Sequence, residues 1–150
     1  MFNIKATLTP DYQRYEGVRP IQIFAMRVGY ALVLITVGNT AWSRILRHEG
    51  PWDPLVAAAL SMWAGSSVLS VIGLINPLKW LPLVLFEIAY KSIWLVIVAY
   101  PLWSTSDLAG SPAEGLTYAF LVVIVPAVLL PWGYVLRTYV LPSRITRGGI

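Results

Sequence analysis

The sequence predicts an all-α integral membrane protein, an antiparallel four-helix bundle formed by a single domain over residues 1–150. Two observations lead to this prediction. The chain is 57% hydrophobic and only 12% charged, whereas a soluble domain is about 45–50% apolar and about 25% charged. Four segments are also mostly apolar over the roughly 20 residues that a helix needs to cross a bilayer. This composition excludes a soluble enzyme and a disordered chain.

The first two predicted spans cover residues 21–42 and 54–75. Pro20 suits the first turn of the first helix, because a proline there removes a backbone donor that has no helical partner. Asp53 is well placed to cap the second helix, and Pro54 follows it in the first turn. Both starts therefore combine apolar length with a local signal for the beginning of a helix.

The third and fourth predicted spans cover residues 78–100 and 112–136. We expect Asn76 to cap the third helix and Pro101 to end it, since the residue before a proline is pushed out of the helical region. The fourth helix is predicted to begin with a capping box formed by Ser111 and Glu114. Pro126 and Pro131 lie inside the fourth span and are expected to kink it. The short turn 73–77 predicts that spans two and three form an antiparallel hairpin.

The distribution of charge predicts that both termini face the cytoplasm. The side with the two termini carries seven basic residues against two acidic ones, and the other side carries two basic residues against four acidic ones. Cytoplasmic segments are enriched in Lys and Arg. The polar tails 1–20 and 137–150 are therefore expected at the cytoplasmic surface, facing lipid headgroups or docked on a partner. Nucleic-acid binding is not expected from this distribution.

Three charged residues lie inside the predicted spans, where charges are costly and normally paired. Arg27 and Glu87 are each about seven residues from the cytoplasmic start of a helix, so they are predicted at similar depth. Lys91 follows Glu87 by one helical turn. We predict a polar cluster in the cytoplasmic half of the bundle, whose further members would be Tyr30, Ser66, Ser67 and Ser70.

The role of this cluster has alternative interpretations. Glu87 could satisfy both Arg27 and Lys91 and so lock the helices together. Alternatively, the excess positive charge could bind an anionic headgroup, a carboxylate or a quinone carbonyl. A proton or cation pathway through Glu87 is a weaker possibility, because the two cations would repel another. A row of small residues in the second span is predicted to pack closely against a neighbouring helix: Ala57, Ser61, Gly65 and Gly73.

The residue counts limit the chemistry that this chain can perform alone. It has no Cys and a single His, His48, in a predicted loop. Thiolate metal sites, iron–sulfur clusters and a bis-His haem are therefore excluded, and no metal site is predicted. We expect no intrinsic cofactor and no catalytic residue, with bound lipid or quinone as the possible small molecules.

The segment Leu69–Leu102, LSVIGLINPLKWLPLVLFEIAYKSIWLVIVAYPL, resembles small uncharacterised bacterial four-helix membrane proteins and, more distantly, the DoxX-like family. Arg27-Val28-Gly29-Tyr30 is similar to the Arg-rich start of that family's first helix. The resemblance implies a bundle in the bacterial inner membrane, sometimes associated with quinone-linked oxidoreductases. It implies no catalytic residue.

Two functions are consistent with these observations. The first is a non-catalytic accessory subunit that packs against other membrane protein subunits of a larger complex, in contact with membrane lipids. The second is a DoxX-like quinone-associated protein, another ligand-handling membrane protein or a small transporter. The second function predicts a ligand-sized cavity beside Arg27, Glu87 and Lys91.

Overall fold

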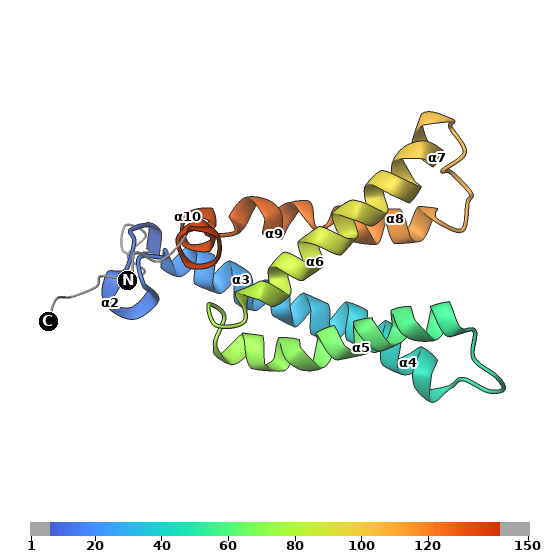
Figure 1. Cartoon of the computed structure of the whole chain (residues 1–150), viewed down its shortest axis with the longest axis horizontal. Coiled ribbons are helices and arrows are strands. Elements are labelled where there is room, and N and C mark those ends of the chain that lie inside the picture. Colours follow the sequence, from blue (N-terminus) through green and yellow to red (C-terminus); the bar gives the residue numbers. More distant parts are fainter. Residues whose placement is uncertain (1–6, 142–150) are drawn as a thin grey trace, which may run out of the picture.

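A computed structural model describes residues 7–141 of the chain, and Figure 1 shows their arrangement. The fold is 76% helical and contains no β-strand within the described residues. Three helices are long and apolar enough to cross a membrane, and a bent pair of helices makes a fourth candidate. The all-α prediction is therefore confirmed. The predicted tail segments 1–6 and 142–150 lie outside the described residues.

The first span is longer than predicted. Helix α3 (Pro20–Leu32), the π-helical segment η1 (Val33–Gly38) and α4 (Asn39–Leu46) form one 27-residue helix from Pro20 to Leu46. It continues beyond residue 42 because no Gly or Pro interrupts the chain before the loop at Gly50. At about 1.5 Å per residue, this helix is about 40 Å long.

The second span has the predicted bounds. Helix α5 (Pro54–Ile75) begins after Asp53, whose carboxylate accepts hydrogen bonds from the backbone amides of Leu55 and Val56, both at 2.9 Å. These amides have no partner inside the helix, so the carboxylate satisfies them. The predicted Asp53 cap is therefore confirmed.

The third span begins and ends later than predicted. Helix α6 (Leu81–Trp94), the π-helical segment η2 (Leu95–Ala99) and α7 (Tyr100–Ser104) form one helix from Leu81 to Ser104. Asn76 ends α5 and does not cap α6. Pro101 does not stop the helix, because it follows the wider π-helical turns, which accommodate a residue that lacks an amide proton.

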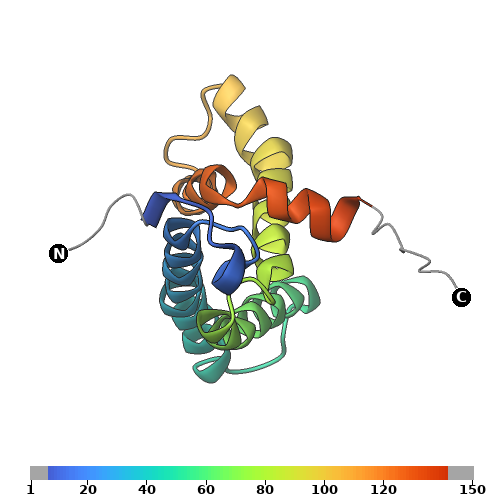
Figure 2. The same cartoon turned by 90° about the vertical axis from the view of Figure 1, so that its left-hand side faces the viewer.

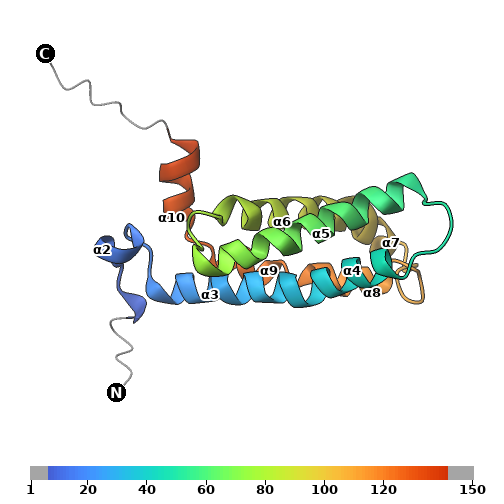
Figure 3. The ribbon, with the colours of Figure 1, turned by 90° about the horizontal axis from the view of Figure 1, so that it is seen from below.

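The fourth span is bent at Pro131, as predicted, and it is divided into several helices rather than one continuous helix over 112–136. Helices α8 (Glu114–Leu121) and α9 (Ile124–Leu129) are followed by α10 (Trp132–Val135) and the π-helical segment η3 (Leu136–Val140). The last two turn by 74° from the first two, and Figures 2 and 3 show them pointing away from the bundle. The predicted capping box is also absent: the Glu114 carboxylate accepts from the amide of Gly110 at 2.7 Å, and the Ser111 hydroxyl donates to the carbonyl of Leu108.

Pro131 causes the break. Leu130, the residue before it, has an extended ψ of 138°, as expected from the steric clash with the proline ring. Pro131 also cannot donate to the carbonyl of Ala127, four residues earlier. The Trp132 indole replaces that donor, since its Nε1 lies 2.8 Å from the Ala127 oxygen. The carbonyl freed by the break is thus satisfied by a side chain of the same segment.

The main core lies at the end of the bundle where α2 (Tyr12–Tyr15) and α10 meet (Figure 1). It is an apolar cluster that joins the segment before α3 to α3, α6 and α10. A smaller cluster of Ala41, Leu60 and Ala64 joins α4 to α5. The buried members of the main cluster are Val18, Ile23, Met26, Tyr30, Leu81, Val84, Leu130, Tyr134 and Val135.

The predicted row of small residues on α5 is only partly buried. Gly73 is buried, Ala57 is half-buried, and Ser61 and Gly65 are exposed. The reason is geometric: each step of four residues turns about 40° around a helix with 3.6 residues per turn, so the row from residue 57 to residue 73 turns by about 160°. The buried residues of α5 are Leu60, Ala64, Ser66, Ser67, Ser70 and Gly73.

Gly73 of α5 packs closely against Tyr30 of α3. A Cβ atom on Gly73 would lie 2.6 Å from the Tyr30 ring, whereas a Cβ on Gly65 would meet nothing within 4 Å. The Tyr30 side chain is 1% exposed, and its hydroxyl donates to the carbonyl of Pro77 at 3.1 Å. The ring is therefore held in place from both sides.

We expect Gly73→Ala to lower the free energy of unfolding by about 1–3 kcal/mol, because the new methyl group overlaps a ring that cannot move away. Gly65→Ala, on the same helix, should change it by less than about 1 kcal/mol. Unfolding of both purified variants in mixed micelles measures the difference. Equal stability of the two variants would contradict the close contact.

Candidate functional site

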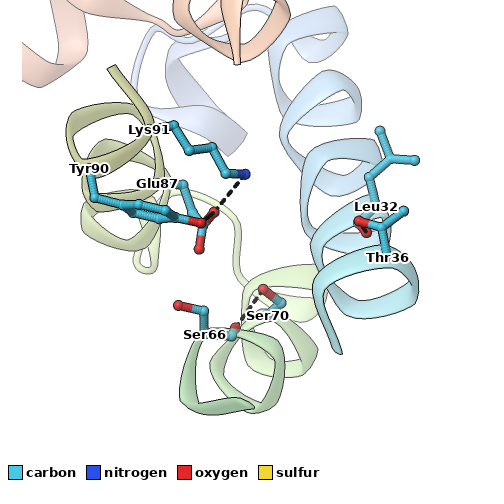
Figure 4. Close-up of polar contacts among 7 residues, drawn as sticks. All are labelled: Leu32, Thr36, Ser66, Ser70, Glu87, Tyr90 and Lys91. Atoms are coloured by element: carbon cyan, nitrogen blue, oxygen red, sulfur yellow. Dashed lines mark hydrogen bonds and ion pairs between the residues drawn. The ribbon is translucent and has the colours of Figure 1, made fainter. Parts of the chain in front are cut away.

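Glu87 and Lys91 form an ion pair in the interior of the bundle (Figure 4). The Lys91 Nζ lies 2.8 Å from Oε2 of Glu87, and the Tyr90 hydroxyl donates to the same oxygen at 3.0 Å. Glu87 is 5% exposed, and its other oxygen, Oε1, is buried without a hydrogen-bond partner. One carboxylate oxygen therefore receives two donors, and the other is an unused acceptor.

An aromatic cluster surrounds this pair. Phe120 of α8 makes edge-to-face contacts with Trp63 of α5 and with Tyr90 and Trp94 of α6, at centroid distances of 6.4, 5.7 and 5.1 Å. The Lys91 ammonium lies 5.8 Å from the centroid of the Phe120 ring, within the range of a cation–π contact. The site thus combines an ion pair with rings from three helices.

Arg27 does not join this cluster. Its side chain is exposed, and its Nε donates to the carbonyl of Leu74 near the C-terminal end of α5, at 3.2 Å. A cation at the C-terminus of a helix satisfies a carbonyl and interacts favourably with the helix dipole. The expected pairing of Arg27 with Glu87 is therefore not formed, because similar depth does not place two side chains on facing sides of their helices.

Tyr30 and the three serines are buried as predicted, but their hydrogen bonds lead elsewhere. Tyr30 donates to Pro77, as described above. Ser70 donates to the carbonyl of Ser66, and Ser67 donates to the carbonyl of Ala64. The Ser67 hydroxyl also accepts a hydrogen bond from the Trp42 indole at 3.1 Å. Among residues 7–141, none of these groups donates to Glu87, so the predicted cluster is divided into separate contacts.

Because Arg27 is not part of the site, the net charge of the site differs from the predicted one. Glu87 and Lys91 carry opposite charges, so the pair has no excess positive charge. The argument for an anion or a quinone carbonyl as ligand required that excess. The open position of the site is a carboxylate oxygen, which would instead receive a hydrogen-bond donor.

The predicted cluster included none of the aromatic residues Tyr90, Trp94, Trp63 and Phe120. Tyr90 could have been found, because it follows Glu87 by three residues and therefore lies on the same helix face. Trp63 and Phe120 lie on other helices. No spacing in the sequence shows that their rings meet.

Polar side chains also occur on the outer face of the first span, which we call the outer polar stripe: Thr36, Asn39 and Thr40. All three are exposed, and their spacing places them on one helix face. Thr36 lies on the side turned away from Glu87 and Lys91 (Figure 4). The threonine hydroxyls donate to carbonyls four residues earlier, and Asn39 accepts from Ser43 at 3.4 Å.

Neither of two surface grooves formed by the described residues is lined by Arg27, Glu87 or Lys91, so neither is the ligand-sized cavity predicted beside those residues. One has a volume of about 400 Å³ and is lined by Leu69, Lys79, Trp80, Pro82 and Leu83. The other lies at the α4–α5 loop. In the part of the chain that the structure describes, no group of three or more His, Asp or Glu residues could hold a metal ion.

Comparison with protein-family models, curated proteins and solved structures finds no significant match to this chain. The DoxX-like resemblance therefore remains a prediction.

We expect Lys91→Met to destabilise the protein by about 3–5 kcal/mol, because it leaves the Glu87 carboxylate buried without a counter-charge. The double substitution Glu87→Gln/Lys91→Met should restore most of that loss, since Gln is uncharged and still accepts from Tyr90. Unfolding in mixed micelles tests both. A double variant as unstable as the single one would show that the charge of Glu87 is not the cause.

Proposed function

We propose that this chain is a non-catalytic accessory subunit of a larger membrane protein complex in the bacterial inner membrane. The observation that supports the proposal is the outer polar stripe. Thr36, Asn39 and Thr40 face away from the bundle in a helix long and apolar enough to span a membrane. Polar side chains on such a face favour contact with another membrane helix over contact with lipid.

Asn39 is the central residue of this proposal. It lies three residues, or about 4.5 Å, further into the membrane than Trp42, and Thr36 lies about 9 Å further in than Trp42. Within residues 7–141, the only hydrogen bond of the Asn39 side chain is the one its oxygen accepts from Ser43. Its amide nitrogen is therefore open to an acceptor on a partner helix. Such a bond in a membrane contributes about 0.6–2 kcal/mol.

The orientation of the subunit follows from its charges. We propose that the end of the bundle with α2 and α10 faces the cytoplasm, because the basic residues Arg14, Arg19, Lys79 and Arg137 belong to this end. Lipids and other membrane protein subunits are then the partners, with no role for nucleic acid. The face of the outer polar stripe remains within the bilayer.

We expect Thr36→Val/Asn39→Val to abolish copurification of partner subunits while the monomer remains folded. The Thr36 hydroxyl donates to a backbone carbonyl of its own helix, so the loss of partner subunits should come mainly from removal of the Asn39 amide. Native mass spectrometry of protein purified from its own membranes in mild detergent measures the partners directly.

Ser92→Val provides a matched control, because Ser92 is an exposed polar residue on the outer face of α6. Partners should be retained by this variant. A wild-type protein that is purely monomeric under the same conditions would overturn the accessory-subunit proposal.

A second candidate is a ligand-handling protein, and the unpaired Oε1 of Glu87 is the observation that favours it. The ligand would be an apolar molecule that carries a hydroxyl group, such as a reduced quinone. Transport of a proton or cation through Glu87 is less favoured, because Lys91 occupies Oε2 and repels cations.

If this second candidate holds, a short-chain quinol should bind the purified protein at least tenfold more tightly than its oxidised quinone, which has no hydroxyl donor. Glu87→Gln keeps an acceptor but loses the charge that strengthens the bond, so it should reduce quinol binding and the preference. Fluorescence titration under anaerobic conditions measures both affinities. Equal binding of the two redox forms would refute a donor-specific site.

A further inference from the structure

The α4–α5 loop lies at the end of the bundle opposite α2 and α10 (Figures 1 and 3), and residues around this loop line a groove. It has a volume of about 460 Å³. Its polar residues come from the end of α4 and the following loop, and its apolar residues come from the start of α5. The groove is lined by Ser43, Arg44, Arg47, His48, Glu49, Trp52, Val56 and Leu60.

Both basic residues of this end of the protein line the same groove. Arg44 and Arg47 are exposed, and neither forms an ion pair within residues 7–141. Two of the four acidic residues at this end are engaged with backbone amides: Asp53 caps α5, and Glu114 accepts from Gly110. Glu49, the acidic residue that lines the groove, offsets one of the two positive charges. The groove therefore has an excess of positive charge.

This concentration of arginine is unusual for a loop that is otherwise acidic. If this end faces away from the cytoplasm, its loops are expected to contain few Lys and Arg residues. Two unpaired arginines in one groove there are therefore a sign of a binding role. A guanidinium group presents a planar fork of N–H donors that matches the oxygens of a phosphate. Two such groups three residues apart on one helix face can bind one anion together.

The remaining walls favour a molecule that is only partly polar. The His48 ring stacks on Trp52, with centroids 3.5 Å apart and ring planes at 18°. Val56 is 47% exposed and offers accessible apolar surface in the groove, whereas Leu60 is buried, at 3% exposed. Trp52 is an aromatic residue of the kind that anchors proteins at the headgroup level.

We propose that this groove binds a phosphoryl group through Arg44 and Arg47, with an attached apolar chain against Val56. The ligand class is an anionic phosphate ester. It is supplied either by the headgroup of a phospholipid or by a soluble phosphate compound, and the apolar wall favours the phospholipid. This site is separate from both the outer polar stripe and the Glu87–Lys91 pair.

Binding to purified, delipidated protein in neutral detergent tests the proposal. Three probes are titrated: phosphatidylglycerol, the zwitterionic phosphatidylcholine and inorganic phosphate. Native mass spectrometry gives bound stoichiometry, and the melting temperature gives apparent affinity. We expect Arg44→Gln/Arg47→Gln to weaken binding of phosphatidylglycerol at least tenfold. Arg14→Gln/Arg137→Gln, which removes the same charge from exposed positions at the opposite end, should leave binding unchanged.

A third variant separates charge from geometry. Arg44→Lys/Arg47→Lys keeps both charges but loses the guanidinium forks, so its affinity should lie between those of wild type and the Gln variant. It also keeps the test valid if the Gln variant fails to fold.

The pattern of probe binding identifies the source of the phosphoryl group. Binding of phosphatidylglycerol that inorganic phosphate does not displace supports a lipid site. Full displacement by inorganic phosphate, with the same dependence on the two arginines, supports a soluble ligand. Equal affinity of wild type and the Gln and Lys variants for phosphatidylglycerol and for phosphate, or no binding to wild type, would overturn the proposal.

Discussion

Backbone carbonyls inside an apolar layer need donors, and much of this structure is organised around supplying them. Water is absent from the hydrocarbon, so each open carbonyl must be satisfied by the protein. Trp132 donates to Ala127 at the proline break, and Arg27 donates to Leu74 at the end of α5. Tyr30 donates to Pro77 in the turn between α5 and α6. The residues that hold the helices together are therefore often those that complete a helix end.

The same requirement explains why the intramembrane charges separate. Arg27 is used to complete α5, so Glu87 retains one cation within reach along its own helix. The pair is neutral and surrounded by rings, which makes it compatible with a buried environment. Among the side chains of residues 7–141, Oε1 of Glu87 is the one buried polar atom without a hydrogen-bond partner, and such atoms are uncommon in folded proteins. Glu87 is therefore the buried side chain that could still accept a hydrogen bond from another molecule.

The elements were predictable where the sequence has both apolar length and a local signal. Helix α5 has both, and its bounds agree with the prediction. In the fourth span Pro131 predicted a bend, but the size of the bend and the division into separate helices could not be predicted, because the apolar length continues through the proline. The polar cluster was predicted from depth alone. The depth of a residue can be obtained by counting residues along the chain. The direction of its side chain depends on how the helix is rotated and packed against its neighbours, and the spacing of residues within one helix does not determine that. The position of the Phe120 ring and the hydrogen bond from Arg27 to Leu74 depend on side-chain direction and therefore could not be predicted.

In a bilayer, the break at Pro131 would give the two sides of the protein different hydrophobic lengths. Glu114–Leu129 rises only about 24 Å at about 1.5 Å per residue, whereas the hydrocarbon core is about 30 Å thick. The first and third spans, with 27 and 24 residues, are longer than that thickness. One side of the protein therefore matches a thin bilayer and the other a thick one. In a membrane, such a mismatch is relieved by local thinning of the lipid or by a neighbouring protein.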